Sequence, residues 1–316
     1  MWTTGDLAPG PTSPTGATVP LLSGGVTLSV QEIAPGVFVA SETTGANFGL
    51  VQTDAGSVLI DAPWIPSQAR AWRKEVELRS PNGVAYRIHT DDHLDHILGS
   101  CFMPPALTVA HETAWKHLKA LDHDTMVQHA LEQAQDRVGD LAAQLAEVSL
   151  VMPEITVGKG MALWCAGRPI EIIHLGGHSP ASLAVFVPDR GVLFAGDLVV
   201  NGIHPYMADA NSREWISALE QIRTMDVRII VPGHGQPGGL EIIERLYEYL
   251  VDFRARVEAS FRAGHTRRET VERVRPIDAF PVEPGDEERV RRILRSSVER
   301  VYDEIKKEAL RNRQRA

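Results

Sequence analysis

Histidine and aspartate residues gather in a few short segments of this 316-residue chain. The densest segment is DDHLDH at residues 91–96, which directly follows the β-type run VAYRIHT. Residues two apart on an extended segment project to the same side, so Asp91 and His93 can face one metal ion. Asp95 and His96, where the chain turns toward a helix, can face a neighbouring ion. The spacing therefore predicts a metal centre.

Three further candidate ligands follow, each beside glycine at the end of a β-type run. They are His178 in GGHSP, Asp197 in GD and His234 in GHG. At strand ends a rigid sheet can aim side chains at a common point while the loops leave that point open. Imidazole and carboxylate ligands together suit zinc, manganese or iron, and zinc is favoured by several histidines mixed with oxygen ligands.

The elements that must position these residues fall into two β-rich groups, each followed by helical sequence. We expect the first group of strands at residues 26–33, 36–40, 47–53, 57–62 and 84–90, and the second at 170–175, 182–188, 191–197 and 227–231. We expect helices at 65–80 and 212–225, two more between about 112 and 148, and helical structure after Gly239. This order predicts an α/β fold with four αββα layers.

The ordered set of motifs resembles the metallo-β-lactamase superfamily, whose pattern is H-x-H-x-D-H followed by a His, a bridging Asp and a His. The resemblance covers roughly residues 25 to 240, and Asp61 in SVLIDA resembles the structural aspartate of the family's first motif. One position departs from the pattern, because Asp91 stands in place of the first His. The additional carboxylate should lower the net charge of the centre by one and favour harder metals.

The resemblance implies a two-metal assignment. Site one would hold Asp91, His93 and His178, site two would hold Asp95, His96 and His234, and Asp197 would bridge. The activity it implies is hydrolysis, in which a metal-bound hydroxide attacks an electrophilic carbon of a small ester, lactone, thioester, lactam or aryl halide. Asp95 is also a candidate proton shuttle. We expect Zn²⁺, one or two ions per chain, with Mn or Fe as alternatives.

Three alternatives remain open at this point. Site one could be weak or empty, so that a single metal acts. The chain could be a mononuclear iron oxygenase that uses His93, His178 and Asp197, or a degenerate member that binds a ligand without turnover. His204 and Tyr206, which follow Asp197 closely, are candidates for lining a substrate pocket.

Two other motifs are weaker. The run GHGQPG at 233–238 matches the dinucleotide pattern G-x-G-x-x-G, but only helices are expected after it, so no βαβ unit can form. The run GHSPA suggests a serine nucleophile turn, but Pro180 favours extended geometry at Ser179 and a strand follows.

The composition, the net charge and the lengths of the apolar runs limit the possible domains, partners and locations. We expect a flexible Pro- and Gly-rich arm at 1–24, a catalytic domain at 25–240 with a helical insertion at about 111–150, and a helical extension at 241–316. The net charge of -9 disfavours nucleic acid as a partner, and no apolar run long enough to span a membrane is present. We expect a small-molecule substrate, a cytoplasmic location and possible homo-oligomers formed through the C-terminal helices.

Overall fold

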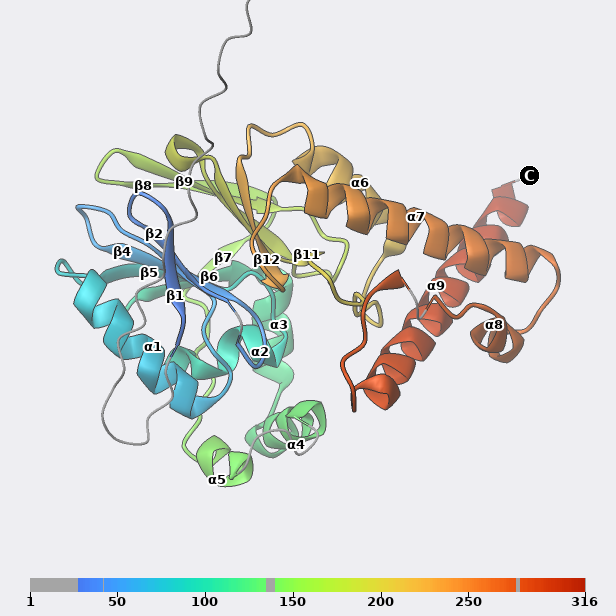
Figure 1. Ribbon diagram of the computed structural model, residues 1–316, viewed down its shortest axis with the longest axis horizontal. Coiled ribbons are helices and arrows are strands. Elements are labelled where there is room, and N and C mark those ends of the chain that lie inside the picture. Colours follow the sequence, from blue (N-terminus) through green and yellow to red (C-terminus); the bar gives the residue numbers. More distant parts are fainter. Residues whose placement is uncertain (1–27, 42, 135–139, 277–278, 316) are drawn as a thin grey trace, which may run out of the picture.

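A computed structural model of the protein describes residues 28–315 except for 42, 135–139 and 277–278. The predicted arm at 1–24 lies outside the described residues. Two β-sheets face each other, and helices cover their outer faces (Figure 1), as the αββα prediction requires. Among the described residues, no helix combines the length and apolar character needed to cross a membrane.

The first sheet contains seven strands that are neighbours in chain order. They are β1 Val30–Ala34, β2 Val37–Ala40, β3 Phe48–Val51, β4 Ser57–Ile60, β5 Val84–Ile88, β6 Leu107–His111 and β7 Ile155–Val157. Strands β1 to β4 pair antiparallel, and β4 to β7 pair parallel. Because parallel strands need crossover connections, helical segments lie between them.

The second sheet has the order β12-β11-β10-β9-β8. Its strands are β8 Gly160–Cys165, β9 Arg168–His174, β10 Leu183–Val187, β11 Val192–Val200 and β12 Ile229–His234. Only the β11–β12 pair is parallel. Alternate residues of β10 face opposite sides: Leu183, Val185 and Val187 pack between the sheets, whereas Ala184 and Phe186 pack under the outer helices.

Helices cover the outer faces and form two additions to the sandwich. Those outside the first sheet are α1 Pro66–Arg79, α2 Leu94–Ile97, α3 Glu112–Ala120, α4 His123–Ala134 and α5 Leu141–Leu145. Those on the second sheet and beyond it are α6 Ser212–Ile222, α7 Leu240–Arg262, α8 Arg267–Arg273 and α9 Glu287–Arg315. The region predicted to hold two helices thus contains three in its described part, with α4 and α5 on either side of residues 135–139.

The C-terminal helices pack onto the rest of the chain. Helix α9 lies beside α7 and α8, and α7 packs on β11. The apolar side chains of α9 are largely buried in this core, with Val298 and Val301 at 1% and 0% exposure. Figure 1 shows α7, α8 and α9 extending to one side of the sandwich. The proposed use of these helices in homo-oligomers stays a prediction.

Candidate metal centre

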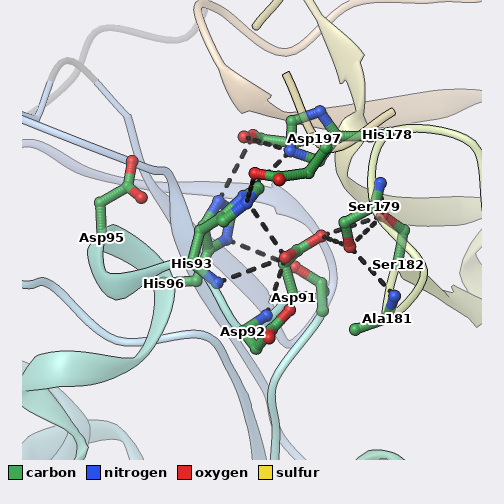
Figure 2. A network of polar contacts seen from close by, with 12 residues as sticks. Asp91, Asp92, His93, Asp95, His96, His178, Ser179, Ala181, Ser182 and Asp197 are labelled. Atoms are coloured by element: carbon green, nitrogen blue, oxygen red, sulfur yellow. Dashed lines mark hydrogen bonds and ion pairs between the residues drawn. The ribbon is translucent and has the colours of Figure 1, made fainter. Parts of the chain in front are cut away.

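The seven predicted ligands come from four separate segments, and the fold brings them together. The segment after β5 supplies Asp91, His93, Asp95 and His96, the loop after β9 supplies His178, β11 supplies Asp197 and the end of β12 supplies His234. These elements belong to both sheets, so the cluster lies where the sheets meet (Figure 2).

The first group of candidate ligands contains Asp91, His93 and His178. The Nδ1 atom of His93 lies 3.0 Å from Nε2 of His178 and 3.4 Å from Oδ1 of Asp91. Nε2 of His178 is 3.5 Å from Oδ2 of Asp197. The ligand atoms of Asp91, His93, His178 and Asp197 therefore lie close to one another.

The second group contains Asp95, His96 and His234. Nε2 of His234 lies 3.3 Å from Oδ2 of Asp95 and 3.4 Å from Oδ1 of Asp197. Nε2 of His96 also lies 3.4 Å from Oδ1 of Asp197. Asp197 therefore turns one oxygen to each group, as a bridging ligand would.

The local shape of β11 explains how Asp197 reaches this position. The sequence predicts that the strand ends at Asp197, but β11 continues to Val200. The register with β12 shifts on both sides of Gly196, which has φ +52°. A bulge of this kind re-aims a side chain without ending the strand. The prediction of a strand end was wrong here, whereas β12 does end at His234.

The spacing of the donor atoms fits divalent metal ions. Ligands of a tetrahedral zinc site lie about 2.0–2.1 Å from the ion, which places neighbouring ligand atoms about 3.3 Å apart. The closest pairs, including those to Asp197, lie 3.0 to 3.5 Å apart, and all ligand atoms within each group lie within 4.8 Å of one another. In addition, Nε2 of His96 and Oδ1 of Asp197 are buried and make no hydrogen bond with any described residue, although they face each other at 3.4 Å. Buried polar atoms without partners are costly, and a bound cation would satisfy both.

Asp61 holds His96 in place, which agrees with the structural role that the sequence suggested for it. Oδ2 of Asp61 lies 2.8 Å from Nδ1 of His96, so the other ring nitrogen, Nε2, is directed at the cluster. Asp61 itself accepts hydrogen bonds from the backbone N–H and the hydroxyl of Thr90, at 2.7 and 2.6 Å. Such carboxylate–histidine contacts fix the ring orientation of metal ligands.

Charge is concentrated in the cluster. Burial opposes protonation of His93, but the neighbouring Asp91 outweighs it and raises the pKa of His93 to about 10. Burial likewise opposes ionisation of Asp197, but His234 and His96 hold its pKa well below the usual range. Metal binding would therefore have to displace protons that the histidines hold in the metal-free protein.

Asp209 and Tyr206 lie on the open side of this cluster. Oδ2 of Asp209 is 3.3 Å from Nε2 of His93, and the Tyr206 ring centroid is 6.1 Å from that of His93. The Asp209 side chain is 55% exposed. His204, by contrast, is buried against Tyr249 and Phe280 of the helical extension. Its predicted contact with a substrate stays a prediction.

Sequence reasoning did not identify Asp209, nor the serines that contact Asp91. Asp209 lies in a polar loop where nothing in its neighbourhood distinguishes it. Ser179 was considered only as a nucleophile, yet its hydroxyl donates a hydrogen bond to Oδ2 of Asp91 at 2.8 Å. Ser182 does the same at 2.9 Å. Contacts between segments this far apart in sequence carry no local signal.

Comparison with known proteins agrees with this geometry. Residues 42–234 match the family profile described as the metallo-beta-lactamase superfamily. The chain belongs to the metallo-beta-lactamase superfamily. The matched residues include all seven candidate ligands, and the family match together with the relatives below supports a metal-dependent hydrolase in general terms.

The relatives of this protein include enzymes of several kinds. The 2,4-dinitroanisole O-demethylase subunit alpha of Nocardioides sp. is 24% identical over 188 residues, which cover 58% of this chain and 51% of that one. The metallo-beta-lactamase type 2 of Bacillus cereus is 24% identical over 67% of this chain and 78% of its own length. The linear primary-alkylsulfatase of a Pseudomonas species is 21% identical over 72% of this chain and 49% of its own.

Solved structures show the same fold. The stereoselective inverting sec-alkylsulfatase of a Pseudomonas species superposes with a TM-score of 0.68 and 17% identity, over 87% of this chain and 50% of that one. A metallo-beta-lactamase family protein of Thermus thermophilus superposes with a TM-score of 0.62 and 17% identity, over 88% and 95%. The chain therefore spans about half the length of the demethylase subunit and of both sulfatases.

Proposed function

We propose that the protein is a two-metal hydrolase that acts on an uncharged small molecule. The observation that carries the two-metal assignment is the position of Asp197, whose two oxygens lie 3.4 and 3.5 Å from nitrogens of opposite ligand groups. Site one would use Asp91, His93 and His178, and site two would use Asp95, His96 and His234. Histidine-rich sites with carboxylates favour zinc.

Two divalent cations held there would lower the pKa of a bound water and so supply a nucleophile at neutral pH. The protein's own contribution is to position that chemistry. Asp95 lies inside the cluster, with Oδ2 3.3 Å from Nε2 of His234, so its carboxylate would be placed to take a proton from a nucleophile generated there. Asp61 and Thr90 keep His96 from rotating.

The charge at the open side of the cluster favours an uncharged substrate. Asp209 is ionised beside His93, because its hydrogen bond with His93 lowers the pKa of the carboxyl group. The divalent cations themselves would attract an anionic group, and the ionised Asp209 would offset part of that attraction on its side of the cluster. An ester, lactone, thioester, lactam or aryl halide would lose nothing in this way. Alkyl sulfates, the substrates named for two relatives, carry such a charge.

Metal content and substrate choice test the proposal together. Inductively coupled plasma mass spectrometry should find about two metal ions per chain, and about one in Asp91→Ala. A chelator should abolish hydrolysis of uncharged esters or lactones, and zinc or manganese should restore it. Asp209→Asn should raise turnover of an alkyl sulfate relative to an uncharged ester. No bound metal in the wild-type protein would refute the hydrolase, and oxygen consumption with iron alone would favour an oxygenase.

A further inference from the structure

The carboxylate of Asp91 is enclosed by hydrogen-bond donors, as Figure 2 shows. Its Oδ1 accepts the backbone N–H groups of Asp92 and His93, at 2.8 and 3.3 Å. Its Oδ2 accepts the hydroxyls of Ser179 and Ser182, at 2.8 and 2.9 Å. The residue is 1% exposed, so protein groups rather than water provide these bonds. Each oxygen thus receives two donors.

The two serines are arranged to donate to Asp91. The Oγ of Ser179 accepts the backbone N–H of Ala181 at 3.1 Å, and the Oγ of Ser182 accepts the backbone N–H of Ser179 at 2.9 Å. A hydroxyl has a single hydrogen, and these backbone donors occupy lone pairs of the serine oxygens. The two Oγ atoms also lie 3.1 Å apart, where either could donate to the other, but an ionised carboxylate can only accept, so both hydroxyls are placed to donate to Oδ2. The turn directly after His178 contains Ser179, Ala181 and Ser182.

The two oxygens of Asp91 consequently differ in their surroundings. Oδ1 lies 3.4 Å from Nδ1 of His93, on the side of the site-one ligands. Each oxygen accepts two hydrogen bonds, but Oδ1 also faces this ligand atom, whereas Oδ2 faces the hydroxyls of Ser179 and Ser182. A carboxylate can bind a cation through one oxygen or through both, and two-oxygen binding suits ions of higher coordination number.

We propose that Ser179 and Ser182 restrict Asp91 to one-oxygen coordination at site one, so that it replaces one histidine nitrogen with one oxygen. This inference rests on the proposed two-metal function. The hydroxyls also draw charge from the carboxylate, which offsets part of the additional negative charge that Asp91 brings. Both serines are positioning residues, because they act on the metal only through Asp91. The pair would thereby keep the coordination number of site one lower than two-oxygen binding by Asp91 would allow, which favours zinc over manganese.

The test uses the cobalt-loaded full-length protein, because four-coordinate Co²⁺ absorbs visible light more strongly than five- or six-coordinate Co²⁺. The wild-type protein should give the stronger absorbance per cobalt, as expected for the lower coordination number at site one. In S179A/S182A the absorbance per cobalt should fall several-fold, and competition between zinc and manganese should shift toward manganese by about 10-fold. Metal content by mass spectrometry gives the occupancy, and circular dichroism verifies the fold. Ser182→Ala alone should give a smaller change of the same kind.

A second background isolates the role of Asp91. In Asp91→His the ligand offers one nitrogen, so removing both serines there should leave the cobalt spectrum unchanged. The matched control is Ser297→Ala, which removes a fully buried hydroxyl from α9, where it donates to the carbonyl of Ile293 at 2.7 Å. This control should retain the wild-type spectrum.

The outcomes separate the inference from the function on which it rests. A wild-type protein that binds cobalt, with an unchanged spectrum in S179A/S182A, overturns the inference and leaves the two-metal hydrolase standing. An equal spectral change in the Asp91→His background also overturns it, because the serines would then act by another route. A wild-type protein that binds no metal refutes the proposed function itself, and the inference with it.

Discussion

Replacing Gly233 by alanine should displace the bridging carboxylate without changing any ligand. A Cβ at position 233 would lie 1.9 Å from Oδ1 of Asp197, 2.7 Å from the carbonyl carbon of Gly196 and 2.8 Å from the backbone nitrogen of Asp197. The backbone of Gly233 is outside the left-handed region, so the conflict is one of space alone. All three contacts are below 3.0 Å, so the backbone at Gly196 and Asp197 must shift together with the carboxylate, which is the softest of the three neighbours.

The size of that movement follows from the contact distances. Real Cβ contacts essentially never fall below 3.0 Å, so Oδ1 must shift by at least about 1.1 Å, the difference between 3.0 and 1.9 Å. Metal sites tolerate ligand errors of only about 0.2 Å. Oδ1 would therefore lose its position between His96 and His234. We expect affinity for the site-two metal to fall at least about 100-fold, which corresponds to about 2.7 kcal/mol.

Zinc affinity, measured by competition with a chromophoric chelator, checks this expectation, and circular dichroism verifies that Gly233→Ala is folded. Gly158→Ala is the matched control, because a Cβ there meets nothing within 4 Å and its backbone needs no positive φ. If folded Gly233→Ala bound zinc as tightly as the wild-type protein, the bridging role of Asp197 would be refuted.

Two further predictions concern the surroundings of the centre. Asp209→Ala should weaken zinc binding about 10-fold, because His93 loses the acceptor that orients its ring, while Asp209→Asn, which keeps an acceptor oxygen, should lose less. Equal zinc affinities in both variants and the wild type would contradict this. Arg254→Ala should lower the free energy of unfolding in urea by about 2 kcal/mol, because the buried Glu304 loses one cationic partner and keeps Arg300 at 3.5 Å and the hydrogen bonds from Ser212. Arg213→Ala should cost less than about 1 kcal/mol, because that side chain is 70% exposed, and a similar loss in both variants would refute the reasoning.

The candidate ligands could be predicted because each of them lies in a short, recognisable stretch of sequence. Asp91, His93, Asp95 and His96 occupy six consecutive positions, and His178, Asp197 and His234 each stand beside glycine in a β-type run. The β-type runs also located β4, β5, β9, β10 and β12, and hence the two-sheet fold. Asp61, which directly follows β4, was suggested only by the family resemblance.

Other features depend on contacts that the sequence does not encode locally. Strand β6 begins at the exposed Leu107, and β8 places Trp164 in solvent at 72% exposure, so in neither strand do the apolar residues mark the buried face alone. Strand β7 has only three residues. The contact between Asp209 and His93 joins positions 116 residues apart, and that between Ser179 and Asp91 joins positions 88 apart. Such pairs become visible only when the chain is folded.

The division of ligands between the two sheets has a consequence for the order of assembly. The first sheet and its loops supply Asp91 through His96, but His178, Asp197 and His234 come from the second sheet, and His234 ends its last strand. During synthesis, the N-terminal sheet emerges first with only part of each ligand group. Neither group is complete in the first 177 residues, since site one needs His178 and site two needs His234. Metal ions can therefore bind both ligand groups only after the two sheets have packed together. Loss of metal should first destabilise the contact between the sheets.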